Sequence, residues 1–109
     1  MRVNEFGAPL DKNGYAPSIL TTEQGKCYLC ENYTHTERHE IFGGSNRTKS
    51  KALGLWVCLC PACHRTGAYA VHQNKFVAEK LHQQGQLVAM HNYGWSVDEF
   101  RRRFGKNYL

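Results

Sequence analysis

CYLC at residues 27–30 and CPAC at residues 60–63 decide how this chain folds. In each tetrapeptide two cysteines flank two residues, a spacing that lets a tight turn point both sulfur atoms to one side. In a chain of 109 residues, 29 residues (31–59) separate the two CxxC pairs. Together the pairs predict the four thiolate ligands of one tetrahedral Zn²⁺ site, Cys27, Cys30, Cys60 and Cys63.

A structural zinc ion would have a large effect on a domain of this size. A chain of about 100 residues buries only about two-thirds of the surface of its unfolded state. Zinc binding to small domains contributes about 10–16 kcal/mol of apparent free energy, so we expect folding to depend on the metal. The N-terminus lacks the apolar segment of a secretory signal, which favours a cytoplasmic protein, where cysteines more often bind metal than form disulfides.

Two other ligand assignments remain open at this stage. A zinc knuckle would use the first CxxC pair, His35 and a fourth ligand at position 40, where the chain has Glu40. Cys58 lies two residues before Cys60 and could be an additional ligand. A small buried core residue is the more common role for such a cysteine.

The sequence between the two CxxC pairs predicts a β-hairpin. The segment ERHEIF (37–42) alternates polar and apolar residues, and LGLWVCLC (53–60) is an apolar strand that leads into the second CxxC pair. Two glycines begin the connection GGSNRTKSKA (43–52), which we expect to be a long basic loop. Residues 1–26 contain two prolines and three glycines with little periodicity, and predict an extended arm.

Two helices are expected after the second CxxC pair. Apolar residues at helical spacing predict a helix within residues 74–94, with Asn74 as its N-cap, although Gly85 argues against one unbroken helix. A capping box at residues 96–99 predicts a final helix that ends at Gly105.

Two strands and a helix around a metal are the outline of a treble-clef zinc domain that contains a ββα-metal site. We therefore predict a small zinc-stabilised α+β fold. It consists of an extended N-terminal arm (1–26) and a single zinc domain (27–109) with additional C-terminal helices.

The chain resembles the small HNH-type nuclease proteins of bacteriophages and prophages, and more distantly the recombination-enhancing nucleases of phages. The resemblance covers nearly the whole chain, from NGYAPSIL near the N-terminus to the closing GKNYL. It rests on the two CxxC pairs and on RHEIFGG (38–44), Asn46-Arg47, Ser50, Gly54-Leu55, His64-Arg65, Val71-His72 and Asn74.

The resemblance implies a metal-dependent DNA endonuclease that hydrolyses phosphodiester bonds with a divalent cation, Mg²⁺, Mn²⁺ or Zn²⁺. It marks His39 and Glu40 as catalytic and His64 and His72 as cation ligands. A neutral imidazole accepts a proton readily at pH 7, whereas a carboxylate is a natural ligand for Mg²⁺ or Mn²⁺. On these grounds we favour His39 as the general base and Glu40 as a metal ligand, with the reverse assignment left open.

One residue of the HNH pattern is missing. Its central asparagine would stand just ahead of the second strand, where this chain has Leu53-Gly54-Leu55. Asn46 and Asn74 are the candidates to replace it. His82 and His91 fall on the expected helix and are interpreted as surface residues.

The charge of the chain favours a polyanionic partner. Fourteen Lys and Arg against nine Asp and Glu give a formal net charge of +5, which suits DNA, although such runs also occur on solvated faces. We expect the following residues to contact phosphates: Asn46, Arg47, Lys49, Lys51 and Arg65.

Other functions are compatible with the same sequence. The main alternative is a non-catalytic treble-clef zinc module that binds DNA or a recombination or phage protein, and a nuclease fold that serves as an inhibitor or structural phage component is a third. No membrane association is expected, and the sequence indicates neither cleavage specificity nor oligomeric state.

Overall fold

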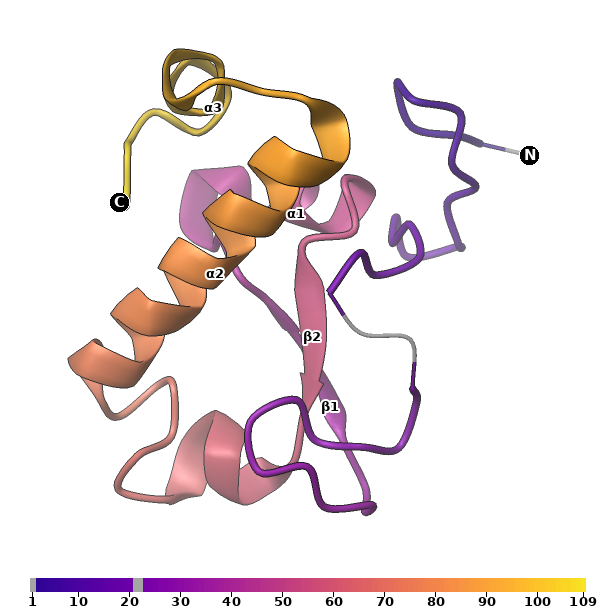
Figure 1. Cartoon of the computed structure of the whole chain (residues 1–109). Coiled ribbons are helices and arrows are strands. Elements are labelled where there is room, and N and C mark those ends of the chain that lie inside the picture. The colour runs from indigo at the N-terminus through magenta and orange to yellow at the C-terminus, as the bar shows by residue number, and fades with distance from the viewer. Residues whose placement is uncertain (1, 21–22) are drawn as a thin grey trace.

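A two-stranded antiparallel hairpin lies at the centre of the computed structural model, which describes residues 2–20 and 23–109 (Figure 1). Its strands are β1 (Glu37–Glu40) and β2 (Trp56–Leu59), shorter than the two segments expected from the sequence. Every residue of β2 is buried, whereas β1 is partly exposed. The small sheet is therefore covered by other parts of the chain.

The two faces of the hairpin carry different side chains, because successive residues of a strand point to opposite sides. The register pairs Glu37 with Leu59 and Glu40 with Trp56. One face therefore presents Glu37, His39, Val57 and Leu59, and the other presents Arg38, Glu40, Trp56 and Cys58. Val57 and Leu59 join the hydrophobic core, which includes Leu81 of the long C-terminal helix.

The connection between the strands is helical, which corrects the expectation of a loop at residues 43–52. A 3₁₀ turn (Gly44–Asn46) leads into helix α1 (Arg47–Ala52). Ser50 holds the helix against the hairpin: its buried hydroxyl donates to the carbonyl of Leu55 at 2.6 Å and accepts from the Phe42 amide at 3.1 Å. The six residues of α1 are largely good helix formers, but the helix is too short to show helical periodicity in the sequence.

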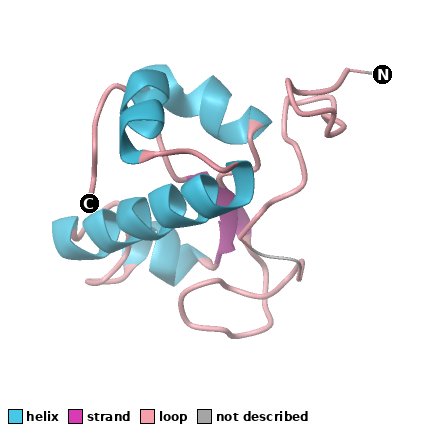
Figure 2. Cartoon of the chain, turned by 45° about the horizontal axis from the view of Figure 1, so that its top comes forward, coloured by secondary structure: helices cyan, strands magenta, loops and turns pink. Residues whose placement is uncertain are grey.

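Beyond β2 the chain forms a π-helical turn (Ala62–Thr66) and then helices α2 (Lys75–Tyr93) and α3 (Val97–Phe104), which surround the hairpin (Figure 2). The predicted caps are confirmed: the Asn74 side chain accepts from the amide of Val77, the Ser96 side chain caps α3, and Gly105 ends it at φ +82°. Within the described ranges 2–20 and 23–109, none of the helices is both long and apolar enough to cross a membrane.

Gly85 lies where α2 packs against Ile41 and Phe42, the two residues after β1. The helix is unbroken through this position, unlike the interruption suggested by the sequence. A Cβ atom at Gly85 would lie 2.9 Å from Cγ2 of Ile41 and 3.3 Å from Cε2 of Phe42, both of which are fully buried. The glycine therefore permits close packing rather than a change of backbone direction.

The N-terminal arm packs against the hairpin face that carries Trp56. The Trp56 indole donates to the carbonyl of Ala16 at 2.8 Å, and the Ile19 amide donates to the carbonyl of Gly54 at 2.9 Å. Nearer its start, the ring of Phe6 stacks on Tyr93 with centroids 4.5 Å apart. Positions 1, 21 and 22 of the expected arm lie outside the described residues.

Replacement of Gly85 by alanine should destabilise the protein, although alanine favours a helix by about 1 kcal/mol over glycine. The added methyl group must displace Ile41 or Phe42 from a filled core, and overpacking of this kind costs about 1–3 kcal/mol. We expect Gly85→Ala to lower the free energy of unfolding by about 1–2 kcal/mol in urea denaturation. Lys80→Ala, on the exposed face of α2, is the control. An increase in stability for Gly85→Ala would contradict the packing described above.

Candidate metal centre

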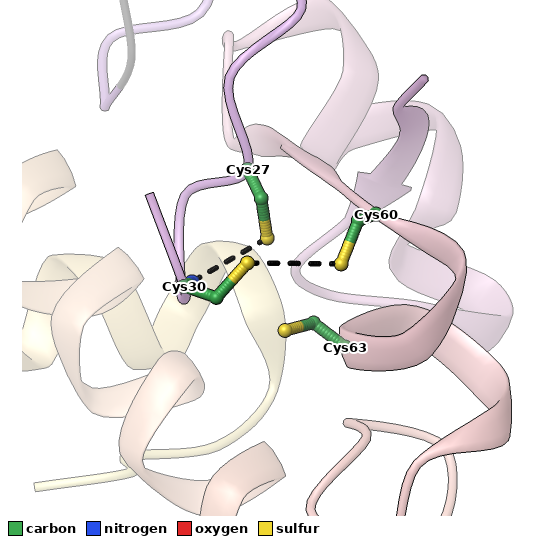
Figure 3. A group of neighbouring side chains, drawn as sticks. All are labelled: Cys27, Cys30, Cys60 and Cys63. Carbon is green, nitrogen blue, oxygen red and sulfur yellow. Dashed lines mark hydrogen bonds between the residues drawn. The ribbon is translucent and has the colours of Figure 1, made fainter. Parts of the chain in front are cut away.

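Four cysteine side chains from two distant segments converge on one point (Figure 3). Their sulfur atoms all lie within 4.8 Å of one another, and the Sγ atoms of Cys30 and Cys60 are 3.8 Å apart. A tetrahedron with Zn–S bonds of about 2.3 Å has edges of about 3.8 Å. Cys27, Cys30, Cys60 and Cys63 are therefore positioned to hold a metal ion, and a set of four thiolates is typical of structural zinc.

The backbone around the first CxxC pair favours the thiolate form of Cys27. This side chain is fully buried, and the amide of Cys30 donates to its Sγ atom at 3.5 Å. Burial raises the pKa of Cys27, but hydrogen bonds from the backbone of Cys30, Cys60 and Leu29 outweigh this effect and lower the pKa to about 6. Because metals bind the thiolate, this environment favours Cys27 as a metal ligand.

The alternative zinc ligands do not join this group. Within the part of the chain that the structure describes, the sulfur cluster includes neither Cys58 nor His35 nor Glu40. Cys58 is a buried strand residue opposite Arg38, on the hairpin face that the arm covers. It has the role of a small core residue.

A second group of possible metal ligands consists of three histidines, His39, His64 and His72. One ring nitrogen from each lies within 4.8 Å of those of the other two, and the ring centroids are 4.8–5.2 Å apart. The histidines come from β1, from the π-helical turn and from the loop before α2. This loop folds back onto the turn, because the amide of Val71 donates to the carbonyl of Cys63 at 2.9 Å.

The surroundings of His39 and His72 favour neutral rings. Burial, followed by the charges of His64 and His72, lowers the pKa of His39 to about 3. Burial also lowers the pKa of His72. A neutral imidazole has the free lone pair that a metal ion or a proton requires, so this environment suits His39 and His72 as ligands.

Glu37 fixes the orientation of His64 and was missed by the sequence reasoning. Its carboxylate lies 2.7 Å from Nδ1 of His64, whose side chain is only 4% exposed, and 3.7 Å from Nε of Arg65. The hydrogen bond from His64 lowers the pKa of Glu37. A carboxylate at Nδ1 leaves Nε2 available for a ligand, as in the carboxylate–histidine–metal arrangement. Alternation along β1 could have identified Glu37, because it shares a face with His39.

Glu40 lies outside the histidine group. It points to the other face of β1, where Nε of Arg47 is 3.3 Å from its carboxylate. The structure thus places His39, and not Glu40, beside His64 and His72, whereas the chemical argument from sequence favoured Glu40 as the ligand. The difference follows from the alternation of neighbouring strand residues.

A cavity of about 400 Å³ connects the histidine group with Glu40. Three arginines, Arg38, Arg47 and Arg65, are among the residues that line it, together with Glu40. His82 also lines the cavity and stacks on Phe42 with the two rings 18° from parallel, so it is not the surface residue expected from the sequence.

The other residues expected to contact phosphates have different partners. The side chains of Asn46 and Lys49 donate to carbonyl groups at the end of α3, and Lys51 lies over the ring of Tyr15 at 4.7 Å. Asn46 and Asn74, the candidates for the missing HNH asparagine, do not line the cavity. Asn74 instead caps α2. Of the expected phosphate ligands, only Arg47 and Arg65 lie at the cavity.

Cys60→Ser should remove one zinc ion per chain, because three thiolates and a hydroxyl hold Zn²⁺ far less tightly than four thiolates. Inductively coupled plasma mass spectrometry would give the metal content, and thermal unfolding should show a large loss of stability. Cys58→Ser, which changes a buried cysteine outside the sulfur cluster, should retain all of the zinc. Equal zinc content in Cys60→Ser and wild type would refute the four-cysteine centre.

Glu37→Ala should weaken binding of Mn²⁺ or Ni²⁺ to the histidine group by about 10–100-fold, because His64 loses the carboxylate that orients it. Titration calorimetry on the zinc-loaded protein would measure the affinity. The matched control is Glu31→Ala, an exposed acidic residue of the first CxxC turn. An unchanged affinity in Glu37→Ala would show that this carboxylate does not support a metal ligand.

Comparison of the chain with models of known protein families, with curated proteins and with solved structures finds no match. The chemistry of the site is therefore judged from its own residues.

Proposed function

We propose that this chain is a metal-dependent endonuclease of the HNH type that hydrolyses phosphodiester bonds in DNA. The observation that carries the proposal is the group of three converging histidines at a cavity lined by three arginines. The histidines can hold a divalent cation, and the arginines can hold a phosphodiester beside it. A module that only binds DNA would need the arginines but not three converging imidazoles.

From the sequence, His39 was favoured as the general base and Glu40 as a metal ligand. The geometry favours the reverse assignment. His39, His64 and His72 would hold the cation, and a carboxylate oxygen of Glu40 would accept the proton of the attacking water. When bound, the cation supplies a more acidic water and offsets charge on the phosphoryl oxygens. Glu40 lines the same cavity, and its side chain is only 12% exposed.

The three arginines differ in their freedom to reach a phosphate. The side chains of Arg47 and Arg65 are 67% and 62% exposed. Arg38 is held by an ion pair with Asp11 at 2.9 Å, and stacks over Tyr15 and Trp56. Contacts to phosphates fix the position of a nucleic acid without reading its sequence, so these residues support binding of DNA in general.

The four-cysteine centre would fix the position of the catalytic group. Cys63 and His64 are consecutive residues of the π-helical turn, so a metal bound by the sulfur atoms also holds the backbone of His64. We therefore propose a structural role for the cysteine centre and a catalytic role for the histidine centre.

The proposal predicts cleavage of supercoiled plasmid DNA in the presence of Mn²⁺ or Mg²⁺. His39→Ala removes a cation ligand and Glu40→Gln removes the proton acceptor, and each change should lower the rate by roughly 10²–10⁴-fold. Agarose gel electrophoresis of the nicked and linear products would measure the rate for wild type and variants prepared together.

His91→Ala is the matched control, because His91 lies exposed on α2 and does not line the cavity. It should cleave at the wild-type rate. Salt-dependent DNA binding by the wild type without a metal-dependent product would instead support the non-catalytic zinc module. Equal cleavage by wild type and His39→Ala would overturn the proposed site.

A further inference from the structure

Tyr69 is the most exposed aromatic residue among those that the structure describes, at 78%. It belongs to the loop between the π-helical turn and α2, which lies at the outer edge of the molecule (Figure 1). Each of the other exposed aromatic rings has a partner: Phe6 stacks on Tyr93, and lysine side chains lie over Tyr33 and Phe76. Within residues 2–20 and 23–109, the Tyr69 ring makes no ring, cation–π or hydrogen-bond contact, so it is open to a ligand.

The backbone that carries Tyr69 is held in place on both sides. The amide of Gly67 donates to the carbonyl of Ala62 at 2.8 Å, and a Cβ atom at Gly67 would lie 2.7 Å from that oxygen, so only glycine fits there. After Tyr69, Ala70 and Val71 are buried, and the Ala70 amide donates to the carbonyl of Gly67 at 3.0 Å. A ring on such a backbone loses little conformational freedom when it binds.

The same loop forms one wall of the cavity at the histidine group. Val71 and His72 line the cavity, whereas Tyr69 lies just outside it, three residues before His72. The Cα atoms of Tyr69 and His72 are at most about 11 Å apart, because each residue extends the chain by no more than about 3.6 Å. This span corresponds to about three nucleotides of a stacked strand. The ring therefore lies beside the place proposed for the scissile phosphodiester.

The surroundings of Tyr69 suit a strand of nucleic acid. Residues 60–78 contain no Asp or Glu but include Arg65 and Lys75. The side chain of Gln73 donates to the carbonyl of Arg65 at 3.0 Å, which ties the backbone of Arg65 to the loop. The Arg65 side chain is largely exposed, although Glu37 lies 3.7 Å away. An exposed ring beside cationic groups is typical of proteins that bind single strands, in which bases stack on the ring and phosphates meet the cations.

We infer that Tyr69 stacks on an unpaired base of the DNA strand whose phosphodiester occupies the cavity. The inference rests on the proposed function and names its substrate class, DNA that is single-stranded or carries unpaired nucleotides beside the cut. In an intact duplex both faces of each base are covered by the neighbouring bases, so the ring has no base on which to stack. Tyr69 therefore favours a single strand over a duplex of the same sequence.

Tyr69→Ala tests the inference through DNA binding. Fluorescence anisotropy with a labelled oligonucleotide of about 20 nucleotides would measure Kd for the single strand and for its duplex. The protein is loaded with zinc and used without added Mn²⁺ or Mg²⁺ to limit cleavage. Loss of base stacking should weaken binding of the single strand about 5–100-fold and change binding of the duplex by less than about twofold.

Two further substitutions at the same position separate stacking from a general apolar contact. Tyr69→Trp keeps a flat aromatic surface and should bind the single strand within about twofold of wild type. Tyr69→Leu keeps an apolar side chain without a flat surface and should lose affinity as Tyr69→Ala does. Because the ring is largely exposed, all three variants should retain the wild-type zinc content and melting temperature.

Tyr33→Ala is the matched control. Tyr33 is also an exposed tyrosine, at 71%, but it follows the first CxxC pair and does not line the cavity. Its replacement should leave both Kd values unchanged.

Three results would overturn the inference. Tyr69→Ala could bind the single strand as tightly as wild type, which would leave the exposed ring to a protein partner. Tyr69→Leu could retain full affinity, or Tyr69→Ala could lose affinity for the single strand and the duplex equally. Binding and cleavage are separate readouts, so a wild type that prefers the single strand through Tyr69 but shows no metal-dependent cleavage would overturn the proposed function and still support stacking on DNA.

Discussion

The convergence of four sulfur atoms is the constraint on which the rest of the structure depends. It joins the turn at residues 27–30 to the end of β2 across 29 residues of chain (31–59). The hairpin lies within that segment, so a metal ion bound by the four sulfur atoms would hold its strands at this end. His64 follows Cys63 directly and pairs with Glu37 of β1, which transmits the same constraint to the histidine group.

The alternation of side chains along β1 then gives the two faces of this strand different surroundings. Glu37 and His39 face the π-helical turn, where the possible cation ligands meet. Arg38 and Glu40 lie on the face toward the N-terminal arm, from which Asp11 pairs with Arg38. A strand of four residues thus presents His39 and Glu37 on one face and Glu40 on the other, and both His39 and Glu40 line the same cavity.

Local sequence signals predicted much of this arrangement. The spacing of the cysteines identified the four sulfur ligands, and side-chain capping at Asn74 and Ser96 located the starts of α2 and α3. These features depend on neighbours within a few residues. Helix α1 was not predicted because six residues are too few for a periodic pattern. Its position depends on contacts of Ser50 with Phe42 and Leu55, which flank the two strands at the connected end of the hairpin.

The candidate site was only partly predictable, because the role of each side chain depends on which face of the strand it occupies. Chemical reasoning about His39 and Glu40 compared their usual pKa values and ligand preferences, but the histidine group forms by the folding back of residues 67–72. Contacts such as that of Glu37 with His64 join residues that lie 27 positions apart in the chain. No local pattern specifies such pairs.

Anomalous diffraction from crystals grown with Mn²⁺ tests the central claim most directly, that one hairpin is held by a sulfur-bound metal and presents a second metal site. Data collected at the zinc and manganese absorption edges distinguish the two ions. We predict a zinc peak among the four sulfur atoms and a manganese peak among the ring nitrogens of His39, His64 and His72. A zinc peak alone, with manganese absent from the histidines or bound elsewhere, would contradict the account.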